Sequence, residues 1–316
     1  MNLWQNYIRP KNLTEAMDAF ANAPRPLLPI AGGTDLLLDL GQGRHSPVQT
    51  LVDVTSIAEM TRLEIIGEEL FIGAAVPVNR IVLDPLAARH AQALTEACDL
   101  IAGPQVRNVA TLGGNVAHAL PAADGTIALL ALNAQAEIAR LAPAAGDGGV
   151  ETYRIPFKDL FIGPGKSSLK HGEELIVGFY IPIQKILRVF AEHPRSETEG
   201  AKTLRVSSCF KRIMRPQGVA LPIINLAIWL ERLDEKIRQI RIAVGPGGPT
   251  PWRATETEKA LTAKSLNDET FNAALEILIA QVGFRSSARR ASADYRRHIV
   301  NGLFKDVLES AWSRAG

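Results

Sequence analysis

The chain has 316 residues, is 47% hydrophobic and 22% charged, and carries a formal net charge of +2. This composition is that of a folded protein and excludes a largely disordered chain. The near-neutral charge argues against a nucleic-acid binder, which usually gathers basic residues on one face. The length predicts two or three packed units.

The N-terminus and the longest apolar run predict a soluble, cytoplasmic protein. Residues 1–17 lack the basic segment and the apolar run of a secretory signal. The run from Val219 to Leu230 is about half as long as the roughly 20 apolar residues that cross a bilayer. It also contains Pro222 and Asn225. We therefore expect no membrane span.

The two cysteines, Cys98 and Cys209, lie far apart in the sequence. We expect both thiols to be reduced and largely buried, as free cysteines usually are. Two thiolates so spaced cannot build a zinc site or an iron–sulfur cluster without other ligands. Any cluster that works with this protein is therefore expected on another chain.

Short strands and helices are predicted along the first half of the chain. Residues 13–22 have apolar positions at helical spacing, with a possible N-cap at Asn12 or Thr14. The further elements predicted here are strands at 27–31 and 50–54, a second element at 35–40 after a Gly32-Gly33 turn, a hairpin of 63–66 and 70–73, a helix at 90–99 and a strand at 136–141.

The second half is predicted to contain one antiparallel sheet followed by helices. Composition predicts a loop at 142–149, and a linker or mobile loop at 184–202. The predicted strands are 209–212, 226–231 and 237–244, and the predicted helices are 266–282 and 293–311. This order is typical of an α+β protein rather than of a doubly wound sheet.

Two Gly-Gly pairs stand about eighty positions apart, each followed by hydroxyl or amide side chains. They are Gly32-Gly33 before Thr34, and Gly113-Gly114 between Thr111 and Asn115. Paired glycines allow positive φ and a close approach of a ligand to the backbone. Consecutive N–H groups in such turns form an anion site. Two such turns facing one another could hold the two phosphates of a dinucleotide.

The alternative is that each glycine pair is only a turn. Neither pair matches the G-x-G-x-x-G pattern, so a Rossmann site is not predicted. The segment Gly163-Pro164-Gly165-Lys166-Ser167 lacks the first glycine of a phosphate-binding P-loop, because position 160 is leucine.

Both glycine segments resemble those of the FAD-binding subunits of molybdenum hydroxylases, the family that includes xanthine and carbon monoxide dehydrogenases. The resemblance rests on AGGTDLLLDL from Ala31 and NVATLGGNVAHALPAADGTIALLAL from Asn108. It continues through Phe210-Lys211 with Arg215, through Ala243 to Ala254, and through Asp294 to Arg297. These segments stand in the family's order and cover nearly the whole chain.

The resemblance implies a vanillyl-alcohol-oxidase-type (PCMH-type) FAD-binding fold. In that fold two α+β subdomains are followed by a C-terminal three-stranded sheet with a helical bundle. The implied domains are a first FAD-binding subdomain at 1–56, a second at 57–183, the linker at 184–202 and a C-terminal flavoprotein domain at 203–316.

The resemblance also implies the residues that contact FAD. The two glycine segments would hold the pyrophosphate, Asp124 would bond ribityl or ribose hydroxyls, and Lys211 would lie near the isoalloxazine or its ribityl chain. A helix N-cap is the alternative role for Asp124, and a solvated strand residue is the alternative for Lys211. The implied positions are Ile30, Ala31, Gly32, Gly33, Thr34, Asp35, Leu36, Ile101, Ala102, Thr111, Gly114, Asn115, Asp124 and Lys211.

By this resemblance the chain binds FAD and passes electrons from [2Fe–2S] clusters on one partner to an external acceptor, while a large partner carries molybdopterin. A heterotrimer, or a dimer of heterotrimers, is implied. No catalytic nucleophile–base pair and no metal site are predicted in this chain. The six histidines are scattered, and only His118 follows a glycine segment. The alternatives are a self-sufficient flavin oxidase or reductase of the same fold and a cofactor-free scaffold.

Two departures from the family pattern stand out. Ala220-Leu221-Pro222 replaces the acidic D-x-A segment that often follows the Lys/Arg stretch. Relatives that reduce an aromatic thioester insert a cysteine-rich, cluster-binding loop, whereas here the sequence runs directly from Asn115 to Leu120. The chain is therefore not expected to carry that extra cluster.

Overall fold

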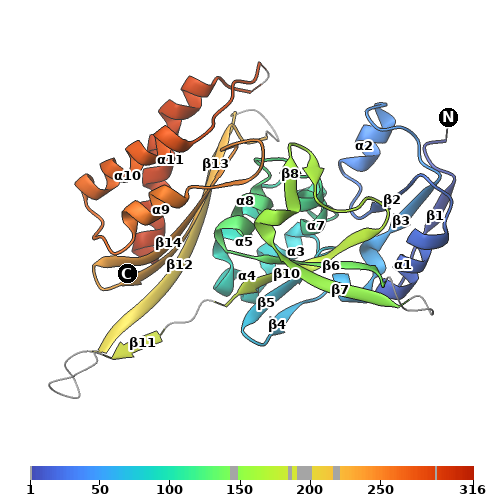
Figure 1. Ribbon diagram of the computed structural model, residues 1–316, viewed down its shortest axis with the longest axis horizontal. Coiled ribbons are helices and arrows are strands. Elements are labelled where there is room, and N and C mark those ends of the chain that lie inside the picture. The colour runs from blue at the N-terminus through green and yellow to red at the C-terminus, as the bar shows by residue number, and fades with distance from the viewer. Residues whose placement is uncertain (1, 143–148, 184–186, 191–200, 216–220, 289) are drawn as a thin grey trace. The chain divides into compact units, whose positions relative to one another are not determined.

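The computed structural model describes residues 2–142, 149–183, 187–190, 201–215, 221–288 and 290–316 (Figure 1). They form two compact units, and neither is continuous in sequence. The first unit contains Met1–Leu86, Cys98–Leu120 and Asn133–Pro182, and the second contains Ala87–Ala97, Pro121–Leu132 and Ile183–Gly316. The domains predicted from the sequence follow one another along the chain. In the structure, by contrast, Ala87–Ala97 and Pro121–Leu132 belong to the same unit as Ile183–Gly316. No helix in the described ranges is long and apolar enough to cross a membrane.

The N-terminal part of the first unit is a small parallel sheet of order β1-β3-β2. Its strands are β1 (Asn6–Ile8), β2 (Leu27–Ile30) and β3 (Thr50–Asp53). Helix α1 (Leu13–Asn22) joins β1 to β2, and the Asn12 side chain caps it by accepting a hydrogen bond from the Glu15 N–H. Helix α2 (Leu36–Gly41) follows β2 directly. The elements predicted here are confirmed, within a residue or two at their ends.

The second sheet of this unit is antiparallel, in the order β4-β5-β10-β6-β7. The predicted hairpin is β4 (Leu63–Ile66) and β5 (Glu69–Gly73), joined through Gly67 at φ +61°. The other strands are β6 (Gln135–Leu141), β7 (Val150–Pro156) and β10 (Glu174–Pro182). The predicted loop at 142–149 falls between β6 and β7, with 143–148 outside the described residues. Strands β8 (Phe161–Gly163) and β9 (Lys166–Ser167) form a separate hairpin where the incomplete P-loop pattern stands.

Six helices lie between β5 and β6 in the chain, and the last of them, α8 (Asp124–Ala131), belongs to the second unit. The predicted helix at 90–99 is α5 (Gln92–Leu100), and His90 belongs to a separate helix, α4 (Pro85–His90). Proline at the first helical position suits the start of α4, because its fixed φ is helical and its missing N–H has no helical partner there. The remaining helices are α3 (Val78–Leu83), α6 (Pro104–Arg107) and α7 (Leu112–Ala117).

The second unit is built on one antiparallel sheet of order β11-β12-β13-β14-β15. The three predicted strands are the long ones, β12 (Ala201–Ile213), β13 (Ile224–Leu233) and β14 (Lys236–Gly245). Short strands β11 (Leu187–Phe190) and β15 (Trp252–Arg253) extend the expected three-stranded sheet at its edges. The predicted linker at 184–202 is therefore partly strand, since β11 pairs with the start of β12; residues 184–186 and 191–200 lie outside the described residues.

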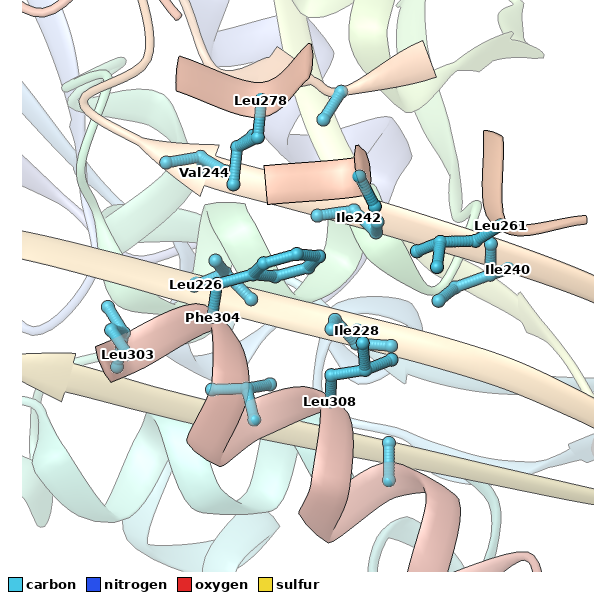
Figure 2. Packing of buried hydrophobic residues seen from close by; sticks show 14 of the residues in the cluster. Leu226, Ile228, Ile240, Ile242, Val244, Leu261, Leu278, Leu303, Phe304 and Leu308 are labelled. Carbon is cyan, nitrogen blue, oxygen red and sulfur yellow. The ribbon is translucent and has the colours of Figure 1, made fainter. Parts of the chain in front are cut away.

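One face of this sheet is covered by the C-terminal helices (Figure 1). These are α9 (Thr255–Leu261), α10 (Asp268–Gln281) and α11 (Ala293–Arg314). Alternate residues of β13, Leu226 and Ile228 among them, point into a dry core with Phe304 and Leu308 of α11, as Figure 2 shows. The α10 and α11 predictions are confirmed, and α9 was not predicted.

The opposite face of the sheet packs against α8 (Asp124–Ala131), which is buried along its whole length. The Asn225 amide on this face donates to the Ala122 carbonyl, 3.0 Å away. A Cβ on Gly245 would lie 2.8 Å from Ile127 Cγ1, so glycine is needed where α8 crosses β14. The sheet therefore has two covered faces, and the strand period decides which side chains reach each one.

Both cysteines are buried and lie outside any disulfide, as predicted. Burial and the Glu96 carboxylate raise the pKa of Cys209 to about 11. Because the thiolate is the reactive form, we expect a thiol reagent at pH 8 to leave Cys209 unmodified in the native protein and to label it after denaturation. Mass spectrometry of both samples checks this. Labelling of native Cys209 at the denatured rate would contradict it.

Candidate functional site

The first glycine pair lies in a tight bend between β2 and α2. Gly33 has φ +68°, the left-handed region that favours glycine. A Cβ on Gly32 would lie 2.0 Å from the Val109 carbonyl oxygen, so only glycine fits there. Positive φ is confirmed for Gly33, whereas the close approach of a ligand to this pair stays a prediction. In the structure, Gly32 lies against the chain's own backbone at residues 109–110.

The same bend carries a run of backbone N–H groups with no partner. From Ala31 to Leu36, no N–H donates a hydrogen bond to any described residue; the first bond on the helical side runs from the Leu37 N–H to the Gly33 carbonyl, at 3.0 Å. Unpaired backbone donors are rare where water is excluded, and consecutive ones form concave anion sites. The bend therefore has the donors that a phosphate group requires.

The second glycine pair differs from the prediction. Gly113 and Gly114 lie in the first turn of α7 and neither has positive φ, so this segment is a helix start rather than a turn. Gly113 is buried, and a Cβ there would lie 2.6 Å from the Ala74 carbonyl oxygen. The Thr111 hydroxyl accepts from the Gly114 N–H at 3.1 Å and caps the helix. This segment uses glycine mainly for close packing.

The structure brings the two glycine segments together. Beyond the contact between Gly32 and Val109, the Asp35 carboxylate lies 3.8 Å from the His118 imidazole. The Asn115 side-chain oxygen is buried and has no hydrogen-bond partner among the described residues. Gly114 is exposed, and a Cβ there would meet only the Thr111 hydroxyl, at 3.2 Å. An unpaired amide, an open glycine and free N–H groups thus share one region of the first unit.

Ile30, Thr34 and Leu36 complete the first segment. Ile30 is the buried last residue of β2, Thr34 is half-buried in the bend, and Leu36 begins α2. They connect the bend to the sheet on one side and to the helix on the other.

Ile101 and Ala102 form a second bend, just after α5. Ala102 has φ +47°, and both carbonyl oxygens accept hydrogen bonds from the Arg107 guanidinium, at 3.2 and 2.9 Å. Arg107 also lies 3.5 Å from the Asp99 carboxylate. Arg107 was not predicted. It ties residues 99–102 to the segment that runs on to Val109 and Thr111.

Asp124 is the first residue of α8 and is buried in the second unit. Its carboxylate pairs with the Arg212 guanidinium, and the Asn225 amide donates to it at 2.7 Å. Burial raises the pKa of Asp124, and the Arg212 charge with the Asn225 hydrogen bond lowers it only in part. Its side chain caps no helix, so the alternative N-cap role is wrong.

Lys211 lies on the other face of the same sheet. Its ammonium pairs with the Asp306 carboxylate of α11 at 2.9 Å, while its neighbour Arg212 turns to Asp124. The structure therefore does not bring Lys211 and Asp124 together. Sequence reasoning named Lys211 and missed Arg212, although the strand predicted at 209–212 already required adjacent residues to face opposite sides.

Comparison with known proteins identifies the family of this chain. Residues 3–184 match the family described as the FAD binding domain in molybdopterin dehydrogenase, and residues 208–311 match the CO dehydrogenase flavoprotein C-terminal domain. The chain is 31% identical over 312 residues to a putative xanthine dehydrogenase FAD-binding subunit of Escherichia coli K12, covering 98% of this chain and 97% of that one. It is 30% identical over 308 residues to the nicotine 6-hydroxylase medium subunit of Paenarthrobacter nicotinovorans, covering 98% and 97%.

The fold also matches a solved structure along its whole length. Carbon monoxide dehydrogenase from Hydrogenophaga pseudoflava, in a form that lacks the Mo-pyranopterin moiety of the molybdenum cofactor, has a chain that aligns with a TM-score of 0.82 at 26% identity. The alignment covers 99% of this chain and 98% of that one. The family resemblance, the PCMH-type α+β fold and the FAD-binding domain expected from the sequence are confirmed. The chain belongs to the molybdenum hydroxylase family, as an oxidoreductase component of the FAD-binding, medium-subunit type.

Proposed function

We propose that this chain passes electrons from [2Fe–2S] clusters on a partner chain, through FAD, to an external acceptor such as NAD⁺ or a quinone. The observation that carries the proposal is the run of unpaired N–H groups from Ala31 to Leu36, set against the second glycine segment. A dinucleotide diphosphate supplies the acceptors that these donors lack. The Asn115 side-chain oxygen, which is buried and has no partner among the described residues, can accept a hydrogen bond from a hydroxyl group of the cofactor.

Bound FAD supplies redox chemistry that the twenty side chains lack. The chain's own residues bind and orient it. The N–H groups of the first bend hold the diphosphate region, and the Asn115 side-chain NH2 group can donate to it as well. Ile101 and Ala102, fixed by Arg107, line the groove beside it. Asp124, held by Arg212 and Asn225, offers a carboxylate acceptor to the hydroxyl groups of the cofactor.

The partners follow from the same proposal. The relatives named above are subunits of larger assemblies by their descriptions, a putative FAD-binding subunit and a medium subunit. We propose a large chain with molybdopterin and a small chain with [2Fe–2S] clusters, as a heterotrimer or a dimer of heterotrimers. Two buried cysteines outside any disulfide suit the reducing cytoplasm, where we place the complex.

The test is purification of the native complex. We expect one FAD per copy of this chain, together with molybdenum and iron. Photochemical reduction of the clusters should then bleach the visible flavin band without added substrate. A chain that purifies with flavin but alone, and turns over a substrate by itself, would indicate the self-sufficient flavin enzyme. A chain without flavin in a native preparation would indicate a scaffold.

A further inference from the structure

Four arginines of the second unit lie together where the chain leaves β12 and where it enters α11. They are Arg215, Arg285, Arg290 and Arg296, called here the arginine patch. Arg215 donates a hydrogen bond to the Arg290 carbonyl at 3.1 Å. Arg296 donates to the Arg285 carbonyl and, at 2.9 Å, to the Ile223 carbonyl. These contacts connect the four residues into one group.

The positive charge of the arginine patch is not neutralised by the described part of the chain. Its hydrogen bonds go to backbone carbonyls, and no described carboxylate forms an ion pair with it; the nearby Asp294 pairs with Arg297 instead, at 2.9 Å. Arg296 is buried, and its burial together with the charges of Arg290 and Arg285 lowers its pKa. Because like charges repel one another, a group of this kind binds anions well.

Exposed apolar side chains border the arginine patch. Tyr295, Met214 and Leu221 are 47%, 37% and 59% exposed. Tyr295 and Met214 each directly precede a patch arginine, and Leu221 stands two positions before Ile223, whose carbonyl binds Arg296. Tyrosine, methionine and arginine are enriched at protein–protein interfaces. A small anion would neutralise the arginines but leave the apolar side chains in water, whereas an acidic protein surface covers both.

We propose that the arginine patch docks a carboxylate-bearing surface of a partner chain in the assembly proposed above. The proposal rests on that assembly. Carboxylates bind guanidinium groups through charge-assisted, often bidentate hydrogen bonds, and apolar groups of the partner pack on the bordering side chains. None of the four arginines is among the residues implied to contact FAD, so docking uses a surface of its own.

The first test is cross-linking of the native complex that carries Arg285→Lys/Arg290→Lys, a variant that keeps both charges. A carbodiimide joins an ammonium group to a carboxylate only where the two are in contact. We expect cross-links from positions 285 and 290 to aspartate or glutamate side chains of one partner chain, identified by mass spectrometry. The control is Arg205→Lys/Arg238→Lys, at two exposed arginines of β12 and β14, which should not reach the same carboxylates.

The second test removes the charge with Arg285→Gln/Arg290→Gln. We expect the complex to dissociate with a Kd about tenfold higher than that of the wild type, because two ion pairs are lost. The salt dependence of that Kd should also become weaker, since fewer charges remain to be screened. Arg205→Gln/Arg238→Gln should keep the wild-type Kd, and both variants should keep the wild-type flavin content. Mass photometry of the diluted complex at low and high salt measures the dissociation.

Three outcomes would overturn the proposal. One is an unchanged Kd and salt dependence in the glutamine variant of the patch. Another is an assembled lysine variant that gives no cross-link to a partner. The third is binding of inorganic phosphate to the wild type that the glutamine variant loses while its assembly is unchanged, which would make the patch a small-anion site. Thermal unfolding checks that each variant folds. A wild-type chain that retains flavin but purifies without partner chains would refute the proposed assembly itself, and the docking proposal with it.

Discussion

Replacing Gly114 by valine is expected to abolish FAD retention in a chain that still folds. Gly114 is exposed and a Cβ there meets only the Thr111 hydroxyl at 3.2 Å, so the chain itself has room for the added side chain, which would stand where we propose that the diphosphate binds. Blocking two charge-assisted hydrogen bonds to a phosphate costs about 3–6 kcal/mol, which weakens FAD binding on the order of 100-fold or more. Flavin content per chain after purification, and titration of the apo protein, measure the effect.

Gly302→Val is the matched control. Gly302 lies inside α11, and a Cβ there meets nothing within 4 Å, so the variant carries the same β-branched side chain in a helix far along the chain. It should keep full flavin content. Gly33→Val should also lose flavin but is harder to interpret, because φ +68° strains any branched residue. If Gly114→Val keeps the flavin content of the wild type, the second glycine segment does not contact FAD.

Replacing Arg212 by methionine is expected to destabilise the protein by about 3–5 kcal/mol, the usual cost of leaving one member of a buried ion pair alone. Asp124 and Arg212 are both buried, and among the described residues only the Asn225 amide would remain as a donor to the carboxylate. Urea unfolding at constant pH measures the loss. The double variant Asp124→Leu/Arg212→Met should recover most of it, since no charge is then buried.

The pH dependence of that variant has a definite sign. Burial already raises the pKa of Asp124, and removing the Arg212 charge raises it further. A carboxyl whose folded pKa is raised contributes most below its unfolded pKa, and that contribution is lost as pH rises through the folded pKa. Arg212→Met should therefore lose more stability at pH 8 than at pH 5. Equal losses at both values would show that Asp124 is not the affected group.

Most of the fold could be predicted because its signals are local. Apolar periodicity located α1, α10 and α11 and the three long strands, and the glycine-containing turn located the β4–β5 hairpin. Elements were missed where tertiary packing decides: α8 is apolar on all sides because it is buried on all sides, so it has no periodicity to read. The strand β11 lies in a stretch whose composition is that of a loop, and its pairing with β12 is a long-range contact.

The candidate site was predictable only in part. The first glycine bend could be predicted, because a Gly-Gly pair between two apolar segments indicates a tight turn with positive φ. The role of the second pair depends on Ala74, almost forty positions earlier, against which Gly113 packs. The partner of Asp124 is Arg212, eighty-eight positions later, and no local pattern connects them. Whether the fourteen residues implied by the resemblance contact FAD stays a prediction, and Lys211 has the weakest position among them because it pairs with α11.

The composition of the second compact unit has a practical consequence for dissecting this chain. Residues Pro121–Leu132, which include all of α8, belong with the sheet formed after residue 183. A truncation between residues 184 and 208, where the two family matches meet, would leave this apolar helix in the N-terminal fragment without the sheet that covers it. In the C-terminal fragment, the same truncation would expose the face of the sheet that α8 covers. Co-expression of both fragments, rather than either alone, is the arrangement expected to yield material that does not aggregate.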